Sequence, residues 1–404
     1  MTGIYLLVLL LALLLQLLCE IISVKKPHIA VIGAGAFGGW TALSLVERGV
    51  QVTLLDAWGP GNSRASSGGE TRIMRCTYGP NQPYTELAAR SLKLWRKYER
   101  QWSKQFFHPS GVLWMVSSKD DAYERGSLPV LREAGVKFYE YSTAQMKKRW
   151  PQISFSDVHW GIFEPDCGYL DARASCQAVA DVFIALCGVY RQVAVLPDGL
   201  EDSPLKALRL SDGTQLKADY YVFACGPWLG KLFPQTFGKY IQPTKQDLFF
   251  FGAPAGDAEF NDNQMPVWGD HGERFFYGIP GNFSRGFKVA DDTRGEPFDP
   301  TSGERVVSQA TLKRVREYVD FRFPAMKGAP LIETRVCQYE QTPDSDFIVD
   351  RHPRMNNVWS LGGGSGHGFK HGPALGKMMA ELVLKDREPQ AVWRLSRFFK
   401  RQEN

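Results

Sequence analysis

The chain has 404 residues, of which 44% are hydrophobic and 23% are charged, as in ordinary globular proteins. This composition excludes a disordered chain, a collagen and a protein with many membrane spans. The net charge of +5 is small for this length and is spread along the chain, so no nucleic-acid partner is expected. The seven cysteines include no C-x-x-C pair, which favours reduced thiols and no metal site.

The first 24 residues form a hydrophobic, signal-like segment. Residues 4–24 are almost continuously apolar, and this run is long enough to cross a bilayer. No basic residue precedes the run, whereas Lys25 and Lys26 follow it. This distribution favours an uncleaved membrane anchor, with the folded part of the chain in the cytoplasm. A cleaved signal and an incorrectly assigned start codon are the alternatives, and the second would leave a soluble cytoplasmic protein.

The sequence then predicts a strand–loop–helix–strand unit. The strands are expected at residues 28–32 and 51–55, the glycine-rich loop at residues 33–39 and the helix at residues 40–48, with Asp56 at the end of the second strand. A G-x-G-x-x-G loop in this setting, followed about 20 residues later by an acid, is typical of dinucleotide binding. The unit therefore predicts a site for an adenine dinucleotide.

Residues of this unit have separate expected roles. Gly33 allows the tight turn, Gly35 lets backbone N–H groups approach a pyrophosphate, and Gly38 lets the helix pack closely on the strand. Phe37 lies in the same loop and is included among the cofactor-binding residues. The Asp56 carboxylate can accept hydrogen bonds from both ribose hydroxyls.

Two later segments indicate which dinucleotide binds. A strand is expected at residues 220–223, and it runs into a Gly-Pro turn at Gly226. Near the C-terminus, a strand at residues 358–361 enters a second glycine-rich turn at residues 362–370, and a helix follows at residues 373–384. A ligand held by glycine-rich turns from both ends of the chain is long and rigid, and FAD has this shape.

On these motifs the chain resembles the D-amino-acid-oxidase superfamily of flavoproteins. Within it, the sequence is most similar to the group of monomeric sarcosine oxidase, N-methyltryptophan oxidase and pipecolate oxidase. The resemblance runs from about residue 26 to residue 386. Besides the first loop it rests on Gly69-Glu70-Thr71-Arg72-Ile73-Met74-Arg75, Phe163-Glu164-Pro165, Ala224-Cys225-Gly226-Pro227-Trp228, Tyr277 with Lys288, Cys337-Gln338-Tyr339, Thr342-Pro343-Asp344 and Gly366-His367-Gly368-Phe369-Lys370.

The resemblance implies an α/β fold of the two-domain α+β type. A Rossmann-like FAD-binding domain is expected to interleave with a substrate domain built on a mostly antiparallel sheet. Strand-rich stretches at residues 111–117 and 245–289 agree with this arrangement. The group also implies a monomer. The expected ranges are 27–110, 155–232 and 335–390 for the FAD-binding domain, and 111–154 and 233–334 for the substrate domain.

The resemblance also implies how the cofactor is held. On the residues alone, Cys337 in a strand would be a small buried hydrophobic side chain. In the group, the matching cysteine forms a thioether to the 8α-methyl carbon of FAD, so a covalent link through Cys337 is expected. The remaining cofactor-binding residues that the motifs imply are Thr71, Arg72, Cys225, Gly226, Trp228, Gly363, Gly366, Gly368 and Lys370.

Two cationic side chains are expected to bind the substrate. Arginine pairs with carboxylate in a two-pronged geometry, so Arg72 and Arg75 suggest an anion clamp, although either could be a solvated or phosphate-binding residue. The resemblance separates them: Arg72 lies near the flavin and shapes the site, whereas Arg75 holds the substrate carboxylate together with Lys370. Tyr277 is expected to shape the pocket or to hydrogen-bond the substrate.

Lys288 is the residue that favours an oxidase. A hairpin is expected to turn between Tyr277 and Lys288, so both side chains could face one pocket. On the residues alone Lys288 could equally lie on a solvated face. Family members use the matching lysine as a fixed cation that stabilises the negative charge developing on oxygen. Lys288, Tyr277 and Arg72 are therefore the expected catalytic residues.

The sequence also departs from the family pattern. Ser67 and Gly68 replace a histidine pair of sarcosine oxidase, and Asp291-Asp292 replaces a histidine that follows the lysine. These changes make sarcosine doubtful and favour a bulkier N-substituted or cyclic amino acid, with a pocket enlarged at Gly68. His367 receives no role.

The expected activity is FAD-dependent oxidation of the C–N bond of a secondary amino acid, with molecular oxygen reduced to hydrogen peroxide. The small-molecule amine and oxygen are the expected partners. A flavin dehydrogenase that passes electrons to a quinone is the main alternative. A non-catalytic subunit that keeps the fold is the second.

Overall fold

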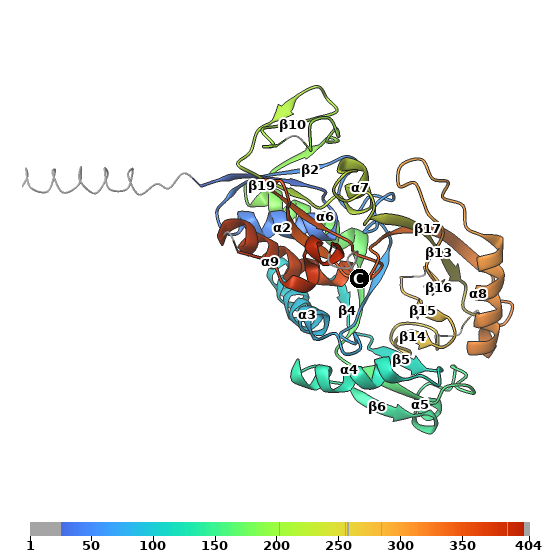
Figure 1. Ribbon diagram of the computed structural model, residues 1–404. Helices are drawn as coiled ribbons and strands as arrows, with labels where there is room; N and C mark the ends of the chain where they lie inside the picture. Colours follow the sequence, from blue (N-terminus) through green and yellow to red (C-terminus); the bar gives the residue numbers. More distant parts are fainter. Residues whose placement is uncertain are drawn as a thin grey trace, which may run out of the picture.

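A computed structural model describes residues 26–201, 203–254, 256, 258–283, 285–385 and 387–399 (Figure 1). The hydrophobic segment at residues 4–24 lies outside this part, so its prediction as an anchor stays a prediction. Within the described residues, no helix combines the length and the apolar character needed to cross a membrane. The cysteines in this part of the chain form no disulfide with one another.

A six-stranded sheet forms the first half of the molecule. Its strands are parallel except at one edge, where β18 runs antiparallel to β19. The N-terminal strand β1 lies in the interior of the sheet, next to a strand from the middle of the chain. The order is β18 (Ile348–His352), β19 (Met355–Gly362), β12 (Tyr220–Phe223), β1 (His28–Ile32), β2 (Gln51–Asp56) and β9 (Val189–Gln192). This topology confirms the Rossmann-like domain.

Helices cover this sheet, and glycines allow them to approach closely. The first helix, α2 (Ala36–Val46), packs against α6 (Ala172–Ala185) and α9 (Gly372–Lys385), and α9 packs in turn against α3 (Gln82–Trp102). At the crossing of α2 and α9, a Cβ atom on Gly376 would lie 2.5 Å from the backbone carbon of Trp40. A larger residue at Gly376 would therefore push the two helices apart.

The helix predicted from residue 40 begins earlier than expected. It starts at Ala36, inside the glycine-rich loop, with Gly35 as its N-cap. Glycines have low helix propensity, which favoured a later start. Packing overrides this preference, because a Cβ on Gly38 would lie 1.9 Å from the Gly33 carbonyl oxygen and only glycine fits there.

An eight-stranded sheet forms the second half of the molecule, on the right and at the bottom in Figure 1. It is antiparallel except where β14 and β5 run parallel, so the mostly antiparallel substrate domain is confirmed. The order is β17 (Leu331–Gln341), β13 (Gln242–Phe251), β16 (Phe287–Asp291), β15 (Phe275–Ile279), β14 (Val267–His271), β5 (Val112–Val116), β7 (Trp160–Glu164) and β6 (Tyr139–Ser142).

The chain passes from one sheet to the other at positions that differ slightly from the predicted domain ranges. β7 falls within the range expected for the FAD-binding domain, yet it pairs with β5 and β6 of the eight-stranded sheet. β17 likewise pairs along its length with β13, although residues 335–341 were expected in the FAD-binding domain. β17 runs from one domain to the other, and the Ser365 N–H near its end donates to the Glu340 carbonyl at 3.0 Å.

The alternation of side chains along β15 and β16 gives the second sheet two different faces. Phe276 points to the outer face, where its ring stacks 4.0 Å from the ring of Tyr318 on α8 (Gln309–Arg322). Tyr277, the next residue, lines a cavity on the inner face together with Lys288. Because successive residues of a strand point to opposite faces, one strand supplies both the core under α8 and the site.

Smaller elements connect the two halves. A three-stranded sheet joins β3 (Thr71–Met74), β8 (Gly168–Asp171) and β4 (Phe107–His108), and it carries the segment with the two predicted arginines. A short hairpin joins β10 (Leu208–Arg209) and β11 (Gln215–Leu216). Further helices are α4 (Ala122–Glu133), α5 (Thr143–Arg149) and α7 (Leu229–Leu232).

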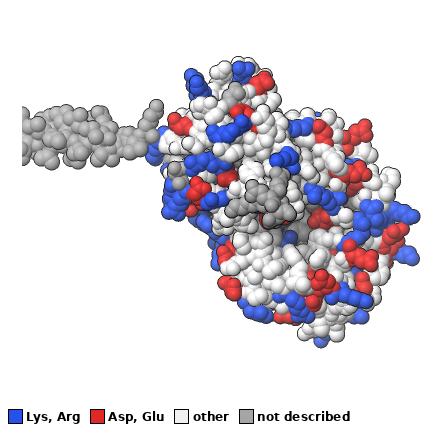
Figure 2. Space-filling model, in the orientation of Figure 1, with Lys and Arg blue, Asp and Glu red and all other residues white. Residues whose placement is uncertain are grey.

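Basic and acidic residues are mixed over the face shown in Figure 2, which is hollowed near its centre.

Candidate active site

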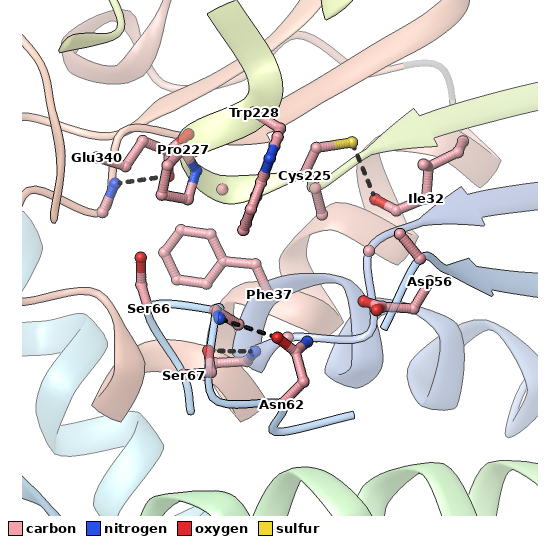
Figure 3. A pocket seen from close by; sticks show the side chains of 18 of the residues that line it. Ile32, Phe37, Asp56, Asn62, Ser66, Ser67, Cys225, Pro227, Trp228 and Glu340 are labelled. Carbon is pink, nitrogen blue, oxygen red and sulfur yellow. Dashed lines mark hydrogen bonds between the residues drawn. The ribbon is translucent and has the colours of Figure 1, made fainter. Parts of the chain in front are cut away.

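Two adjoining cavities lie where the sheets meet. The first has a volume of about 370 Å³ and is lined by both glycine-rich turns and by the Gly-Pro turn after β12 (Figure 3). Predicted cofactor-binding residues that line it are Gly33, Gly35, Phe37, Asp56, Arg72, Cys225, Gly226, Trp228, Gly366 and Gly368. Gly38, Thr71 and Gly363 line neither cavity.

The first turn depends on the backbone of Gly33. Its φ of +105° is in the left-handed region, and an added Cβ would lie 2.2 Å from the Ala224 carbonyl oxygen. The Gly33 N–H donates to the Leu55 carbonyl at 2.7 Å, and the Ser67 hydroxyl accepts from the Ala36 N–H at 3.1 Å. The turn is thereby tied to β2 and to the segment that follows it.

Asp56 is held at the end of β2 by backbone donors. Its carboxylate accepts from the N–H groups of Ala34 at 2.7 Å, Gly59 at 2.8 Å and Trp58 at 2.9 Å. Burial raises the pKa of Asp56 above its ordinary value, and the three N–H groups oppose that shift. This carboxylate lines the cavity, as a group that binds ribose hydroxyls must.

The residues of the first cavity fit an FAD molecule. Ser66 and Glu340 line this cavity, and the Ser66 hydroxyl and one carboxylate oxygen of Glu340 are buried without a hydrogen-bond partner among the described residues. Burial raises the pKa of Glu340 to about 7. Buried polar atoms without partners are costly, so a polar ligand is expected to satisfy these two.

The second cavity has a volume of about 250 Å³ and is rich in cationic side chains. Arg72, Arg75, Lys288 and Lys370 line it, together with Tyr277, Cys337 and Gly366. Trp114, Phe275 and Phe369 add aromatic surface. The two cavities share the wall formed by Arg72, Tyr339, Gly366 and Phe369.

Arg75 is fixed by aromatic stacking on one side of this cavity. Its guanidinium carbon lies 4.2 Å from the ring centre of Tyr78 and 5.0 Å from that of Trp114, and it donates to the Thr77 carbonyl. The buried Glu164 carboxylate holds the same segment, because it accepts from the Cys76 N–H and the Thr77 hydroxyl, both at 2.7 Å.

Lys370 approaches the cavity from the C-terminal glycine-rich turn. It is only 4% exposed, and its ammonium donates to the Tyr78 hydroxyl at 2.9 Å and to the His367 carbonyl at 2.7 Å. Burial and the charge of Arg75 hold the pKa of Lys370 well below its ordinary value. The Trp95 indole donates to the Lys370 carbonyl at 2.9 Å and anchors this turn to α3.

Lys288 and Arg72 meet at the Thr71 carbonyl. The Lys288 ammonium donates to this oxygen at 3.1 Å, and Arg72 donates to it at 2.8 Å. Lys288 is 3% exposed, and burial together with the charge of Arg72 lowers its pKa to about 7. Thr71 therefore contributes through its backbone. The hairpin between β15 and β16 brings Tyr277 and Lys288 into one cavity, as expected.

Cys337 is buried on β17 and lines the second cavity. The Arg72 guanidinium lies 3.4 Å from its sulfur, and the Ser66 carbonyl lies 3.9 Å from it. Its neighbour on the strand, Tyr339, belongs to the wall between the cavities. Cys337, the predicted attachment point of FAD, thus lies next to the wall between the two cavities.

One expectation about the pocket is wrong. Gly68 does not enlarge the second cavity, because it lines neither cavity. It belongs instead to a turn formed by residues 62–68. A Cβ on Gly68 would lie 1.8 Å from the Asn62 carbonyl oxygen, so glycine is required by this turn.

The sequence reasoning assigned no role to three residues of the site. Asp292 carries the one acidic side chain among the described residues that line the second cavity. Trp114 on β5 supplies aromatic surface, and Glu164 on β7 positions the Arg75 segment. Asp292 lies in a segment that differs from the family pattern and Glu164 in one that matches it, but nothing in the local sequence indicates which way an acidic side chain points. No sequence signal marked Trp114.

The chain belongs to the family of FAD dependent oxidoreductases, whose sequence profile matches residues 28–382. Monomeric sarcosine oxidase from Bacillus sp. (strain B-0618) is 28% identical over 363 residues, covering 88% of this chain and 92% of that enzyme. N-methyl-L-tryptophan oxidase from Salmonella typhi is 25% identical over 392 residues, covering 92% of this chain and 99% of that enzyme.

The fold is also shared with solved structures. L-proline dehydrogenase from P. horikoshii superposes with a TM-score of 0.81 at 22% identity, covering 93% of this chain and 98% of that one. An Amadoriase I mutant from Aspergillus fumigatus superposes with a TM-score of 0.78 at 20% identity, covering 94% and 91%. The predicted family, fold class and enzyme class are therefore confirmed: the protein is an FAD-dependent oxidoreductase.

Proposed function

We propose that this protein oxidises the C–N bond of a secondary amino acid and passes the electrons to molecular oxygen, which forms hydrogen peroxide. The observation that carries the proposal is the second cavity. Its two predicted carboxylate-binding cations, Arg75 and Lys370, lie among aromatic side chains, and its wall is shared with the dinucleotide cavity. A substrate held there would present its amine close to the cofactor.

FAD supplies the redox chemistry when it is bound in the first cavity. The chain's own residues bind and orient the substrate: Arg75 and Lys370 hold its carboxylate, and Tyr277 shapes the cavity. In its protonated form, Lys288 provides a positive charge for the oxygen step. Arg72 lies in the shared wall, where its charge can act in both cavities.

The substrate is proposed to be larger than sarcosine. The aromatic surface of Trp114 and Phe275 suits an N-substituted or cyclic amino acid with an apolar part. A Cβ on Gly269 would lie 2.8 Å from the Trp114 ring and 3.2 Å from the Phe275 ring, so this glycine makes room for both. Relatives named for sarcosine and for N-methyl-L-tryptophan are consistent with this chemical class.

A covalent link between Cys337 and FAD is part of the proposal. Its support is the buried sulfur beside Arg72 and next to the shared wall. The denatured wild type should keep a yellow band on an SDS gel, and Cys337→Ser should lose it. Cys176→Ser is the control, because Cys176 is buried on α6 and lines neither cavity. A Cys337→Ser band that stays yellow would refute the link.

The activity is tested by anaerobic mixing of the purified protein with sarcosine, N-methyl-L-tryptophan, L-proline or pipecolate. Bleaching of the flavin absorbance by at least one of them is the expected result. Admission of air should then give one hydrogen peroxide for each amine oxidised. Little peroxide with rapid reduction of a quinone would identify a dehydrogenase. Absence of bleaching by all four would contradict the proposal and favour the non-catalytic subunit.

A further inference from the structure

The second cavity contains an acidic side chain as well as its cations. Asp292 follows β16 directly and lines the cavity with Arg75 and Lys370. Its backbone N–H donates to the Phe275 carbonyl at 2.8 Å, which fixes the residue to β15. In the group that the chain resembles, a histidine follows the lysine where this chain has Asp291-Asp292.

A chain of hydroxyl groups holds the Asp292 carboxylate. The Tyr339 hydroxyl donates to one of its oxygens at 2.8 Å, and the Tyr277 hydroxyl lies 3.5 Å from that of Tyr339. All three residues line the cavity. A hydrogen bond from Tyr339 stabilises the ionised carboxylate, so the group is available as an anion and as a proton acceptor.

The adjacent acid does not share this position. Asp291 ends β16 on the opposite face, where its carboxylate accepts from Arg274 at 2.7 Å and lies 3.4 Å from Arg314. This buried carboxylate is paired with the two arginines and does not line the cavity. Of the two acids that replace the family histidine, only Asp292 can meet a substrate.

We propose that Asp292 binds the ammonium group of the substrate and takes one proton from it. This deepens the proposed function and rests on it. The step converts a secondary ammonium and a carboxylate into a neutral amine and a carboxylic acid, so charge and protons balance without a further reagent. A neutral amine has the nitrogen lone pair that oxidation of the adjacent C–H bond requires. The substrate class is therefore a zwitterion, with its carboxylate at Arg75 and Lys370 and its ammonium at Asp292.

The charges around Asp292 give this step a pH range. Burial and the neighbouring Asp291 raise its pKa, whereas Tyr339, Arg75 and Lys370 lower it, and the result is a value of about 6. Lys288, on β16, is a further cation of the same cavity. Because the ionised form accepts the proton, the function of Asp292 is present above this pKa and is lost as the pH falls through it.

The first test measures binding without turnover. Trimethylglycine carries a fixed positive charge and a carboxylate, and 3,3-dimethylbutanoate has the same shape and carboxylate without the positive charge. The dissociation constant of the uncharged isostere divided by that of trimethylglycine measures the contribution of the positive charge. At pH 8 this ratio should be about tenfold larger for the wild-type holoenzyme than for Asp292→Asn, which is the size expected for one modest ion pair. Perturbation of the flavin absorbance reports both dissociation constants. An unchanged ratio in the variant would overturn the inference.

The second test measures the proton step by anaerobic flavin reduction across pH, with the fastest of the four amino acids. The ratio of reduction rate constant to dissociation constant should fall in the wild type below about pH 6. In Asp292→Asn the same ratio should be about 100-fold lower at pH 7, as expected for loss of a general base. It should then keep rising with pH until the pH reaches the pKa of the free amine. A variant curve parallel to the wild type would overturn the proposal.

Two further variants separate this role from a structural one. Asp292→Glu keeps a carboxylate and should restore part of the rate at pH 7. Asp291→Asn removes a charge that lies outside the cavity and raises the pKa of Asp292, so the curve should keep its shape and its midpoint should move to lower pH. If the wild type is not reduced by any of the amino acids, the proposed function fails. If the wild type is reduced and Asp292→Asn behaves identically, only the inference about Asp292 fails.

Discussion

The two cavities are built in different ways. The dinucleotide cavity is lined by glycines from three turns together with other residues, and at Gly33 a Cβ would collide with the backbone of Ala224. The substrate cavity is lined by long charged and aromatic side chains from β3, β5, β15, β16, β17 and the C-terminal turn. The first cavity depends on backbone conformation, and the second depends on the identity of individual side chains. Substitutions should therefore fail in different ways in the two cavities.

The largest effect is expected at the turn of the first cavity. Gly33→Ala places a methyl group 2.2 Å from the Ala224 carbonyl oxygen at a φ of +105°, so the turn must open and FAD should be lost. The ratio of flavin to protein absorbance should fall to near zero. The control is Gly213→Ala, which has a φ of +81° but no neighbour within 4 Å, and it should cost roughly 1 kcal/mol and keep the flavin. Full flavin content in Gly33→Ala would contradict the comparison.

A smaller but selective effect is expected at Lys288. Lys288→Met removes the fixed positive charge beside Thr71, and the rate of flavin reoxidation by oxygen should fall about 100-fold or more. Stopped-flow measurements of the two half-reactions should show a much smaller change in reduction by the amine. Lys245→Met is the control, since Lys245 lies on β13 outside both cavities. Equal losses in the two half-reactions would reject the assigned role.

Substitution at Arg75 should affect substrate binding. Arg75→Lys keeps the charge but loses the planar guanidinium that stacks on Tyr78 and Trp114 and can pair with a carboxylate through two hydrogen bonds. The dissociation constant of an amino-acid substrate should rise about tenfold, with the flavin content unchanged. Arg96→Lys is the control, because Arg96 on α3 lines neither cavity. If Arg96→Lys raised the dissociation constant and Arg75→Lys left it unchanged, the result would contradict this role.

The smallest effect is expected at Glu164, which touches no ligand. Glu164→Gln replaces an acceptor of the Cys76 and Thr77 hydrogen bonds with an NH2 group, so one buried donor loses its partner. The expected destabilisation is about 1–3 kcal/mol, seen as a lower thermal midpoint. Glu140→Gln, at an exposed ion pair, should change the midpoint by much less. Unchanged stability in Glu164→Gln would show that the Arg75 segment does not need this carboxylate.

The contrast between the cavities also explains what could be predicted. The strands at residues 28–32 and 220–223 and the role of Gly33 followed from local sequence, because a strand, a glycine-rich turn and a helix are contiguous. The resemblance then supplied Arg75, Lys288 and Lys370, which the structure places in one cavity. Helix α2 began earlier than expected, since close packing at Gly38 outweighed its low helix propensity.

The sequence by itself determined the fold class, the dinucleotide site and the family, because these depend on motifs that are short and contiguous. Only the tertiary structure decided the wall between the cavities and the partners of the acids. Glu164 meets Cys76 across 88 positions, and Lys288 meets Thr71 across 217. Which face of a strand such a side chain occupies depends on the register between distant strands, and that register is fixed only when both sheets have packed together.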